Sequence, residues 1–439
     1  MTDTPSAPDK LAADEISGSS PGSSGSPAVS PDRLPALRRR IQAVLIATQI
    51  LGGLGIAIGV ALAAVLAKEV SGTEALAGLA STASVVGPAL LAMPLAALMA
   101  RRGRRAGLVL AYLVGAVGAG VAVLGAAIGS FPVLLLGLVG FGAGSSANLA
   151  ARFAAADLAE PDRRARAIST VVWATTIGAV LGPNVAAPAG ESVAGLGIPV
   201  AAGPFVWASG VFIVSAAMVA LLLRPDPLLT ARALAGPEEA AAADGRSLKA
   251  GLRAVRESSR ARLALVTVAI SHTAMVSIMS MTPVALSHHG ADIRLIGLVI
   301  SGHIAGMYAF SPVMGWLSDR LGRLSVIGLA VALLAVAALL AGTAGPSHGQ
   351  TALGLFVLGL GWSAGLVSGS ALLTDSVPQA ARAAVQGLSD FIMNAAAGVG
   401  GLSAGLIVSQ AGYGWLNVVG ACLLLPMAFL AVRAATRRA

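Results

Sequence analysis

The sequence predicts an all-α membrane protein in which twelve transmembrane helices form two pseudo-symmetric six-helix bundles. Three observations support this fold. Apolar residues make up 56% of the 439 residues and charged residues only 11%, which is more apolar surface than a soluble fold could bury. Short basic clusters separate the long apolar runs, and the second half of the chain repeats features of the first. The net charge of +9 is therefore interpreted as membrane topology, and no nucleic-acid partner is expected.

Crossing the hydrocarbon of a bilayer takes roughly 20 apolar helical residues. Residues 1–40 begin with a segment rich in Ser, Pro and Gly, and we expect a disordered cytoplasmic tail there. The predicted spans are 41–67, 76–100, 106–128, 132–157, 166–188, 203–224, 262–287, 294–318, 324–345, 350–374, 383–409 and 414–433. They divide into an N-terminal bundle at 41–224, a cytoplasmic linker at 225–261, a C-terminal bundle at 262–433 and a short cytoplasmic tail at 434–439.

The positions of Lys and Arg predict the orientation, because cytoplasmic loops accumulate these residues. With the N-terminus inside, the clusters at 101–105, 163–166 and 433–438 all fall on the cytoplasmic side, whereas Lys68 and Arg294 fall outside. We therefore predict a multi-pass protein of the plasma (inner) membrane with both termini in the cytoplasm. The lipid bilayer is its first expected partner, and we expect a monomer.

The linker contains a stretch with helical amphipathicity. Leu248, Leu252 and Val255 recur at helical spacing beside basic residues. This pattern favours a short amphipathic helix on the inner leaflet. A plain solvated linker helix is the alternative.

An internal repeat is visible when the chain is shifted against itself by about 218 to 219 residues. Three features then align, each at the same place in the order of spans. The loop 96–105 faces the loop 315–324, Asp157 and Arg164 face Asp375 and Arg382, and Gly178 and Gly182 face Ala396 and Gly400. Two parallel halves are implied, with the charged pairs near the inner surface as gating pairs or as solvated charges.

The loop after the eighth span has an ordered set of glycines and charges: Gly315, Asp319, Arg320, Gly322 and Arg323. A glycine permits close helix approach, and a carboxylate can accept hydrogen bonds from the N-terminus of a neighbouring helix or from Arg. Such a latch can form in one conformation and break in another. The alternative is a basic loop that only sets topology.

This loop is similar to a loop signature of the major facilitator superfamily, and the resemblance covers nearly the whole chain after residue 40. The resemblance implies secondary transport by movement of the two halves about a central site. The first copy of the loop departs from the signature, with Ala96 for the glycine and Ala100 for the aspartate. We therefore expect gating to depend mainly on the second copy.

The fifth span carries Gly178, Gly182 and Pro183. This group resembles the glycine-proline motif of the drug and metabolite antiporters of the superfamily, which favours efflux over uptake. Glycines four residues apart also serve simple close packing of helices, and a proline bends a helix. Many proton-coupled members carry an Arg where this chain has Leu138, and Arg152 follows much later in that span. The usual route of proton coupling is therefore not expected.

Two histidines are predicted near the middle of the membrane. Met275 and Met279 share a helix face with His272, and Met307 shares one with His303. Imidazole and thioether together suit a soft metal ion. A titratable and adaptable substrate pocket is a second interpretation, and ordinary packing with hydrogen bonds to backbone carbonyls is a third. The sequence does not decide whether metal binds.

Other polar residues within spans are candidates for substrate binding or ion coupling, because unpartnered polar groups are costly in hydrocarbon. Asp390 and Asn394 lie one helical turn apart in the eleventh span. Gln49 and Asn148 either line the cavity or join helices by hydrogen bonds.

No phosphate-binding loop, nucleophile elbow or metalloprotease pair is present in the sequence. We therefore expect neither an enzyme nor a cofactor. The leading hypothesis is proton- or ion-linked efflux of small organic molecules by alternating access, with a small-molecule substrate and a coupling proton or other ion as partners. The alternatives are a transition-metal or metal-chelate carrier and a non-transporting membrane sensor or scaffold.

Overall fold

The structure, a computed structural model, describes residues 31–235 and 248–436, and these residues form helices and connecting turns without any β-strand. Eleven helical stretches are long and apolar enough to cross a membrane. The predicted second span, 76–100, falls within α2 (Glu74–Arg102), which is not among these eleven. The all-helical membrane fold predicted from the sequence is thus confirmed at this level.

The first half consists of six helical stretches, one of which is broken. Gly144 separates the two segments of the broken stretch. Two residues earlier, an added side chain at Gly142 would lie 2.0 Å from the backbone oxygen of Ser84 on α2. Glycine is therefore needed where these helices touch. The helices are α1 (Leu34–Ser71), α2 (Glu74–Arg102), α3 (Arg104–Ala127), α4 (Phe131–Ala143), α5 (Ser145–Asp157), α6 (Arg164–Glu191) and α7 (Gly203–Leu222).

The second half repeats this order of helices with different breaks. Its helices are α11 (Ser259–His288), α12 (Ile293–Tyr308), α13 (Ser311–Leu321), α14 (Arg323–Gly342), α15 (His348–Asp375), α16 (Arg382–Ala411), α17 (Tyr413–Leu423) and α18 (Leu425–Thr436). Two shorter helices lie between the halves, α8 (Pro227–Leu234) and α10 (Leu248–Glu257).

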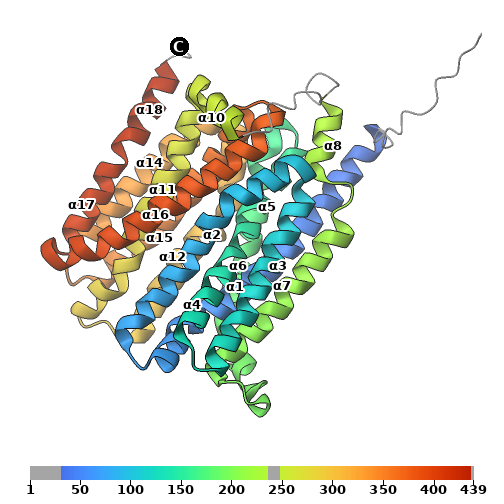
Figure 1. Cartoon of the computed structure of the whole chain (residues 1–439). Helices are drawn as coiled ribbons and strands as arrows, with labels where there is room; N and C mark the ends of the chain where they lie inside the picture. The colour runs from blue at the N-terminus through green and yellow to red at the C-terminus, as the bar shows by residue number, and fades with distance from the viewer. Residues whose placement is uncertain (1–30, 236–247, 437–439) are drawn as a thin grey trace, which may run out of the picture.

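The helices of each half pack on one another, and one core cluster also joins residues of both halves, among them Ile168 and Leu334. In the first half, α1 packs on α6 and α7 and α3 packs on α4 and α7. Phe141 and Phe205 meet there in an edge-to-face contact with ring centroids 5.2 Å apart, an arrangement that aromatic rings prefer. In the second half, α15 packs against α11, α12 and α14. The two bundles lie side by side in Figure 1.

The halves meet mainly along two helix pairs, α2 with α16 and α6 with α13. Each pair joins a second span of one half to a fifth span of the other. The contacts are therefore related by the internal repeat, and they carry the polar groups described below.

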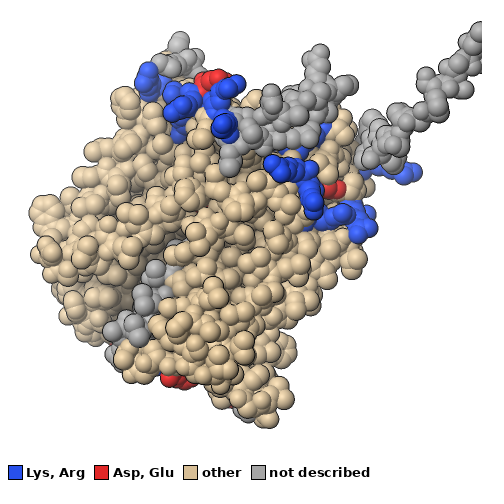
Figure 2. Space-filling view, in the orientation of Figure 1, with Lys and Arg blue, Asp and Glu red and all other residues tan. Residues whose placement is uncertain are grey.

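Lys and Arg side chains gather at one end of the molecule, shown in blue in Figure 2. We call this the basic end. Helix α1 begins there and α18 ends there (Figure 1). On the face shown in Figure 2, the surface is hollowed between the two halves in the part away from the basic end.

The ends of several elements differ from the predictions. Helix α1 begins at Leu34, because Pro35 fits the first helical turn, Leu37 packs on the core and Arg38 pairs with Glu160. Residues 34–40 are thus helical and not part of a disordered tail, and residues 1–30 lie outside the described part. Helix α18 runs on to Thr436, and α8 in the linker was not anticipated.

The amphipathic helix expected in the linker is present as α10. Val255 is buried in a core cluster of the second half, and Leu252 is exposed. An added side chain at Gly251 would lie 3.0 Å from the side chain of Ala384 on α16. This helix therefore packs on the second half along part of its apolar face.

Candidate functional site

A buried ion pair joins the halves where α5 faces α16. Nη2 of Arg152 donates to Oδ1 of Asp390 over 2.6 Å, and Arg152 is 1% exposed. The guanidinium also donates to the hydroxyl of Ser370 on α15 over 3.2 Å and to the backbone oxygen of Leu149 over 2.9 Å. A buried charge persists in apolar surroundings only when it is paired in this way.

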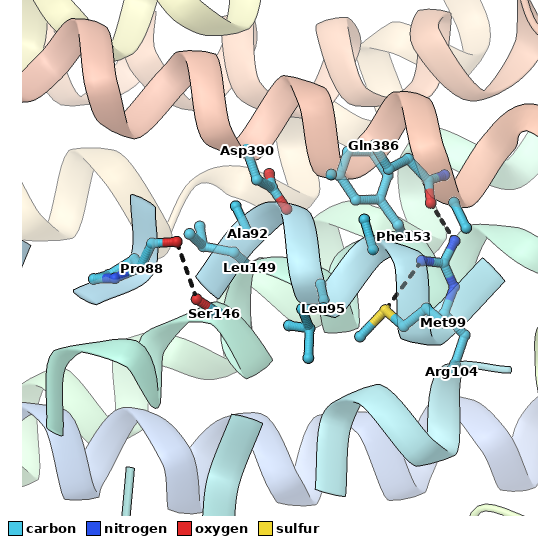
Figure 3. Close-up of a pocket in the computed structure, with 14 residues that line it drawn as sticks. Pro88, Ala92, Leu95, Met99, Arg104, Ser146, Leu149, Phe153, Gln386 and Asp390 are labelled. Carbon is cyan, nitrogen blue, oxygen red and sulfur yellow. Dashed lines mark hydrogen bonds between the residues drawn. The ribbon is translucent and has the colours of Figure 1, made fainter. Parts of the chain in front are cut away.

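A small pocket adjoins this pair between α2, α5 and α16 (Figure 3). Asp390 stands at one side of it, and Arg104 and Gln386 stand at the other. Arg104 donates to Asp157 over 2.7 and 3.2 Å and also to the side-chain oxygen of Gln386 across the interface. Arg104 is the first residue of α3, and it thereby ties the start of that helix to both α5 and α16.

Asp319 occupies the N-terminus of α6 in the opposite half. Its carboxylate accepts from the backbone N–H groups of Ala165 and Arg166 over 3.1 and 2.9 Å, and from Arg323 over 2.7 Å. The first turn of a helix has N–H groups without partners inside the helix and a partial positive charge. Asp319 therefore supplies from α13 the cap that α6 lacks in its own sequence.

A second ion-pair group lies beside this cap at the basic end. Asp375 accepts from Arg164 over 2.5 Å and from Arg323 over 3.2 Å. The alignment in the sequence grouped Asp157 with Arg164, but Asp157 pairs with Arg104 and Arg164 pairs across the interface. Arg382 is buried nearby, and none of these ion pairs includes it.

Small residues permit close approach at both helix pairs. An added side chain at Gly315 would lie 2.0 Å from Oγ of Ser169 on α6. An added side chain at Gly387 on α16 would lie 2.0 Å from Cβ of Ala96 on α2. Ala96 replaces the signature glycine in the first loop, and the glycine needed for contact lies on the partner helix instead.

The remaining residues of the second loop have different surroundings. Gly322 has φ of +90°, in the region that favours glycine, and it forms the turn between α13 and α14. Arg320 is exposed and lies over the Trp316 ring at 5.1 Å from the centroid. Arg320 therefore belongs to the surface of the basic end.

The histidines are held by different partners. His272 accepts from the indole N–H of Trp362 over 2.9 Å, and Trp362 meets Tyr308 edge to face at 5.5 Å. His303 is fully buried, with Nδ1 2.8 Å from the backbone oxygen of Leu355. Among residues 31–235 and 248–436, no group of three or more His, Cys, Asp or Glu is placed to hold a metal ion.

The methionines expected beside the histidines belong largely to the core. Met275 and Met307 are buried, and Met279 packs partly buried against the same cluster. These positions agree with the packing interpretation given in the sequence analysis.

Two of the other polar candidates join neighbouring helices, and the third bonds within its own helix. Gln49 donates to the hydroxyl of Thr175 over 2.8 Å, and Asn148 accepts from the Tyr112 hydroxyl over 3.1 Å. The amide of Asn394 donates to the backbone oxygen of Asp390 over 2.7 Å. With Gln386, these last two residues form a polar stripe along α16 at four-residue spacing, which places them on one helix face.

The glycines of the fifth span face α1 within the same half. An added side chain at Gly178 would lie 2.4 Å from the backbone nitrogen of Leu54, and one at Gly182 would lie 2.3 Å from Cβ of Ala57. Helix α6 continues through Pro183 to Glu191. These contacts are the close packing that such spacing permits.

Sequence reasoning overlooked Arg152, Arg104, Gln386 and Trp362 as site residues. The signal for Arg152 was present, because a lone Arg within an apolar span requires a partner. The partner lies more than 200 residues away in the chain, so spacing alone could not identify it.

These features define a class of protein: a polytopic membrane protein whose two helical halves are joined at one end by polar contacts. The family model described as Major Facilitator Superfamily matches residues 44–290 and 263–439. The chain therefore belongs to the Major Facilitator Superfamily of transporters, which confirms the resemblance in its sequence.

Two relatives are similar in sequence to this chain over most of its length. The uncharacterized MFS-type transporter YdeG of Bacillus subtilis is 37% identical over 400 residues, which cover 90% of this chain and 92% of YdeG. The riboflavin transporter RfnT of Brucella anthropi is 30% identical over 382 residues, which cover 87% and 92%.

Solved structures share the fold at low identity. The human organic anion transporter MFSD10 has a TM-score of 0.69 at 19% identity and covers 90% of this chain and 99% of its own. The transporter FucP, in the outward conformation, has a TM-score of 0.68 at 16% identity, with 89% and 97% covered.

Proposed function

We propose that this transporter exports small organic molecules in exchange for protons by alternating access. In this proposal twelve helices span the plasma membrane, α2 included, and the basic end faces the cytoplasm, as the distribution of Lys and Arg favours. The observation that carries the proposal is the buried ion pair between Arg152 and Asp390, because it joins the two halves and includes a group that can take up a proton.

Protonation of Asp390 removes the partner of a buried cation. Breaking a buried ion pair by neutralising one member costs about 3–5 kcal/mol, since the other charge stays uncompensated. A change of that size is sufficient to move a two-state equilibrium from one dominant conformation toward the other. Protonation therefore favours separation of α5 and α16 and opening of the basic end.

The direction of exchange is proposed from the closed end together with the glycines of the fifth span. The ion pair and the Asp319 cap are formed together at the closed basic end, while the hollow lies away from it (Figure 2). A proton that enters from the hollow reaches Asp390, opens the basic end and leaves there, and substrate moves the opposite way. The resemblance of Gly178, Gly182 and Pro183 to the antiporter motif supports the same direction.

The substrate class is proposed as small organic molecules with aromatic rings. The relative named as a riboflavin transporter supports this class, and the partly exposed side chains of His272 and Tyr308 beside Trp362 offer rings against which a planar molecule can stack. Among the described residues, no observation favours the metal carrier or the scaffold.

The test uses purified protein in liposomes with an imposed pH gradient and radiolabelled riboflavin, followed by a panel of aromatic metabolites and drugs. We expect wild-type protein to accumulate substrate against its gradient when protons flow the other way. Asp390→Asn should abolish this gradient-driven accumulation and retain exchange of substrate at equal concentrations. The matched control is Asp162→Asn, an exposed position at the basic end. Absence of solute movement under every imposed gradient would exclude the proposal.

A further inference from the structure

The pocket between α2, α5 and α16 has polar groups at both of its sides and apolar walls between them. Its volume is about 20 Å³, and a cavity of roughly 10–15 Å³ is enough for one water molecule when polar partners are present. Asp390 borders the pocket on one side, and Arg104 and Gln386 border it on the other (Figure 3). The pocket therefore continues from the proton-binding group toward the basic end.

Arg104 and Gln386 close this route. Arg104 is 1% exposed and Gln386 is 2% exposed. Gln386 accepts from Arg104 in the other half, and its amide nitrogen lies 3.4 Å from the hydroxyl of Thr374 on α15. The side chain is thus held by both of its polar ends, directly between the pocket and the basic end.

We propose that the contact between Arg104 and Gln386 is a proton seal, which keeps Asp390 from exchanging protons with the cytoplasm while the basic end is closed. This inference rests on the proposed function, since it assumes that Asp390 carries the coupled proton. When the halves separate, Gln386 leaves Arg104, the pocket opens to the basic end, and the proton is released there. A proton is thereby delivered only in the conformation that also admits substrate.

The charges around the pocket fit this role. Asp390 pairs with Arg152 and Asp157 pairs with Arg104, so the group is neutral while Asp390 is ionised. Gln386 can accept from Arg104 without binding a proton at ordinary pH. A carboxylate in its place would itself be a site for protons, and the seal would become a relay.

The test measures proton leak without substrate in proteoliposomes that contain a pH-sensitive dye, with potassium and valinomycin to balance charge. Gln386→Ala should raise the leak at least severalfold over wild type, because it opens a water-sized path between Asp390 and the basic end. Adding Asp390→Asn to this variant should return the leak to the wild-type level, since the route then lacks its proton-binding group. The control is Gln350→Ala, which removes a glutamine at the opposite end of the molecule.

A second substitution keeps the seal testable when Gln386→Ala lowers the yield of folded protein. Gln386→Glu retains an acceptor for Arg104, and its leak should rise as the pH falls, because the new carboxyl group carries protons. A leak equal to wild type in both variants would overturn the seal. If Asp390→Asn alone leaves pH-driven accumulation intact, the proposed proton coupling fails, and that result is distinguishable from failure of the seal.

Discussion

The two helix pairs that join the halves, α2 with α16 and α6 with α13, solve the same packing problem with different residues. Each brings helices together at a position related by the repeat. At one pair the small residues are Ala96 and Gly387, and at the other they are Ser169 and Gly315. The glycine lies on the fifth span of its half in the first pair and on the second span in the other, but the helices approach closely in both.

The polar contacts at the two pairs differ more. Asp319 caps α6 with a full negative charge, whereas the equivalent position in the first loop is Ala100, and α16 receives a hydrogen bond from Arg104 through Gln386 instead. Close steric contact is thus common to both pairs, and a carboxylate that caps the opposing helix belongs to one of them. At the other pair a guanidinium donates to a neutral amide, and the ion pair of Arg152 with Asp390 lies on the same helix, α16.

The largest expected effect comes from filling either close contact. Gly387→Leu and Gly315→Leu should each abolish nearly all transport, because even a Cβ atom at either position would lie 2.0 Å from the facing side chain of Ala96 or Ser169, and overpacking costs about 1–3 kcal/mol or more. Spin-label distances across the basic end should lengthen in both variants. The single cysteine, Cys422, makes a cysteine-free background simple to prepare. Wild-type distances in either variant would contradict the contact.

Exchanging the small residues tests whether the two pairs are equivalent. Gly315→Ala alone should impair transport strongly, since the new Cβ would meet the side chain of Ser169. Adding Ser169→Gly recreates the alanine-glycine contact of the other pair and removes the clash with the serine side chain. The new Cβ would still lie 2.8 Å from the backbone oxygen of Ala165, so transport should recover in part. Failure of this double variant to improve on Gly315→Ala would show that the pairs are not interchangeable.

Removing the charge of the cap should have a moderate effect. Asp319→Asn leaves a hydrogen-bonding side chain but weakens its interaction with the start of α6 and with Arg323. A charge at a partly buried helix N-terminus contributes up to about 2 kcal/mol, so the ratio of closed to open conformations should fall by up to about thirtyfold. Spin-label distances across the basic end report this shift. Asp162→Asn serves as the exposed control.

Much of the fold followed from the sequence, because apolar runs, basic loops and a repeat are local or periodic signals. Asp319 and Gly315 were also identifiable, since the order of residues in their loop is distinctive. The partner of Asp390 was not, because ion pairs between halves depend on how the bundles face each other. The contact of Gly387 could not be predicted for the same reason. A glycine in a helix rich in small residues does not stand out in the sequence until the facing residue on the other helix is known.

The histidines illustrate a second limit. Their spacing from methionines predicted a shared face, and several interpretations fitted that face equally well. Hydrogen bonds distinguish them, because Trp362 and the backbone at Leu355 each take a ring nitrogen. The spacing of residues in the sequence predicts which side chains share a helix face, but it does not predict which groups of other helices contact that face.

The contacts of α8 and of the residue before it bear on where the chain could be split into two fragments. Asp226 accepts from the backbone N–H of Arg105 over 2.7 Å, and Arg232 donates to the backbone oxygen of Ala100 over 2.7 Å. The beginning of the linker thus completes the loop of the first half. Two polypeptides meant to reassemble into a working carrier should therefore be cut after Leu234, so that the first fragment retains the segment that completes its part of the basic end.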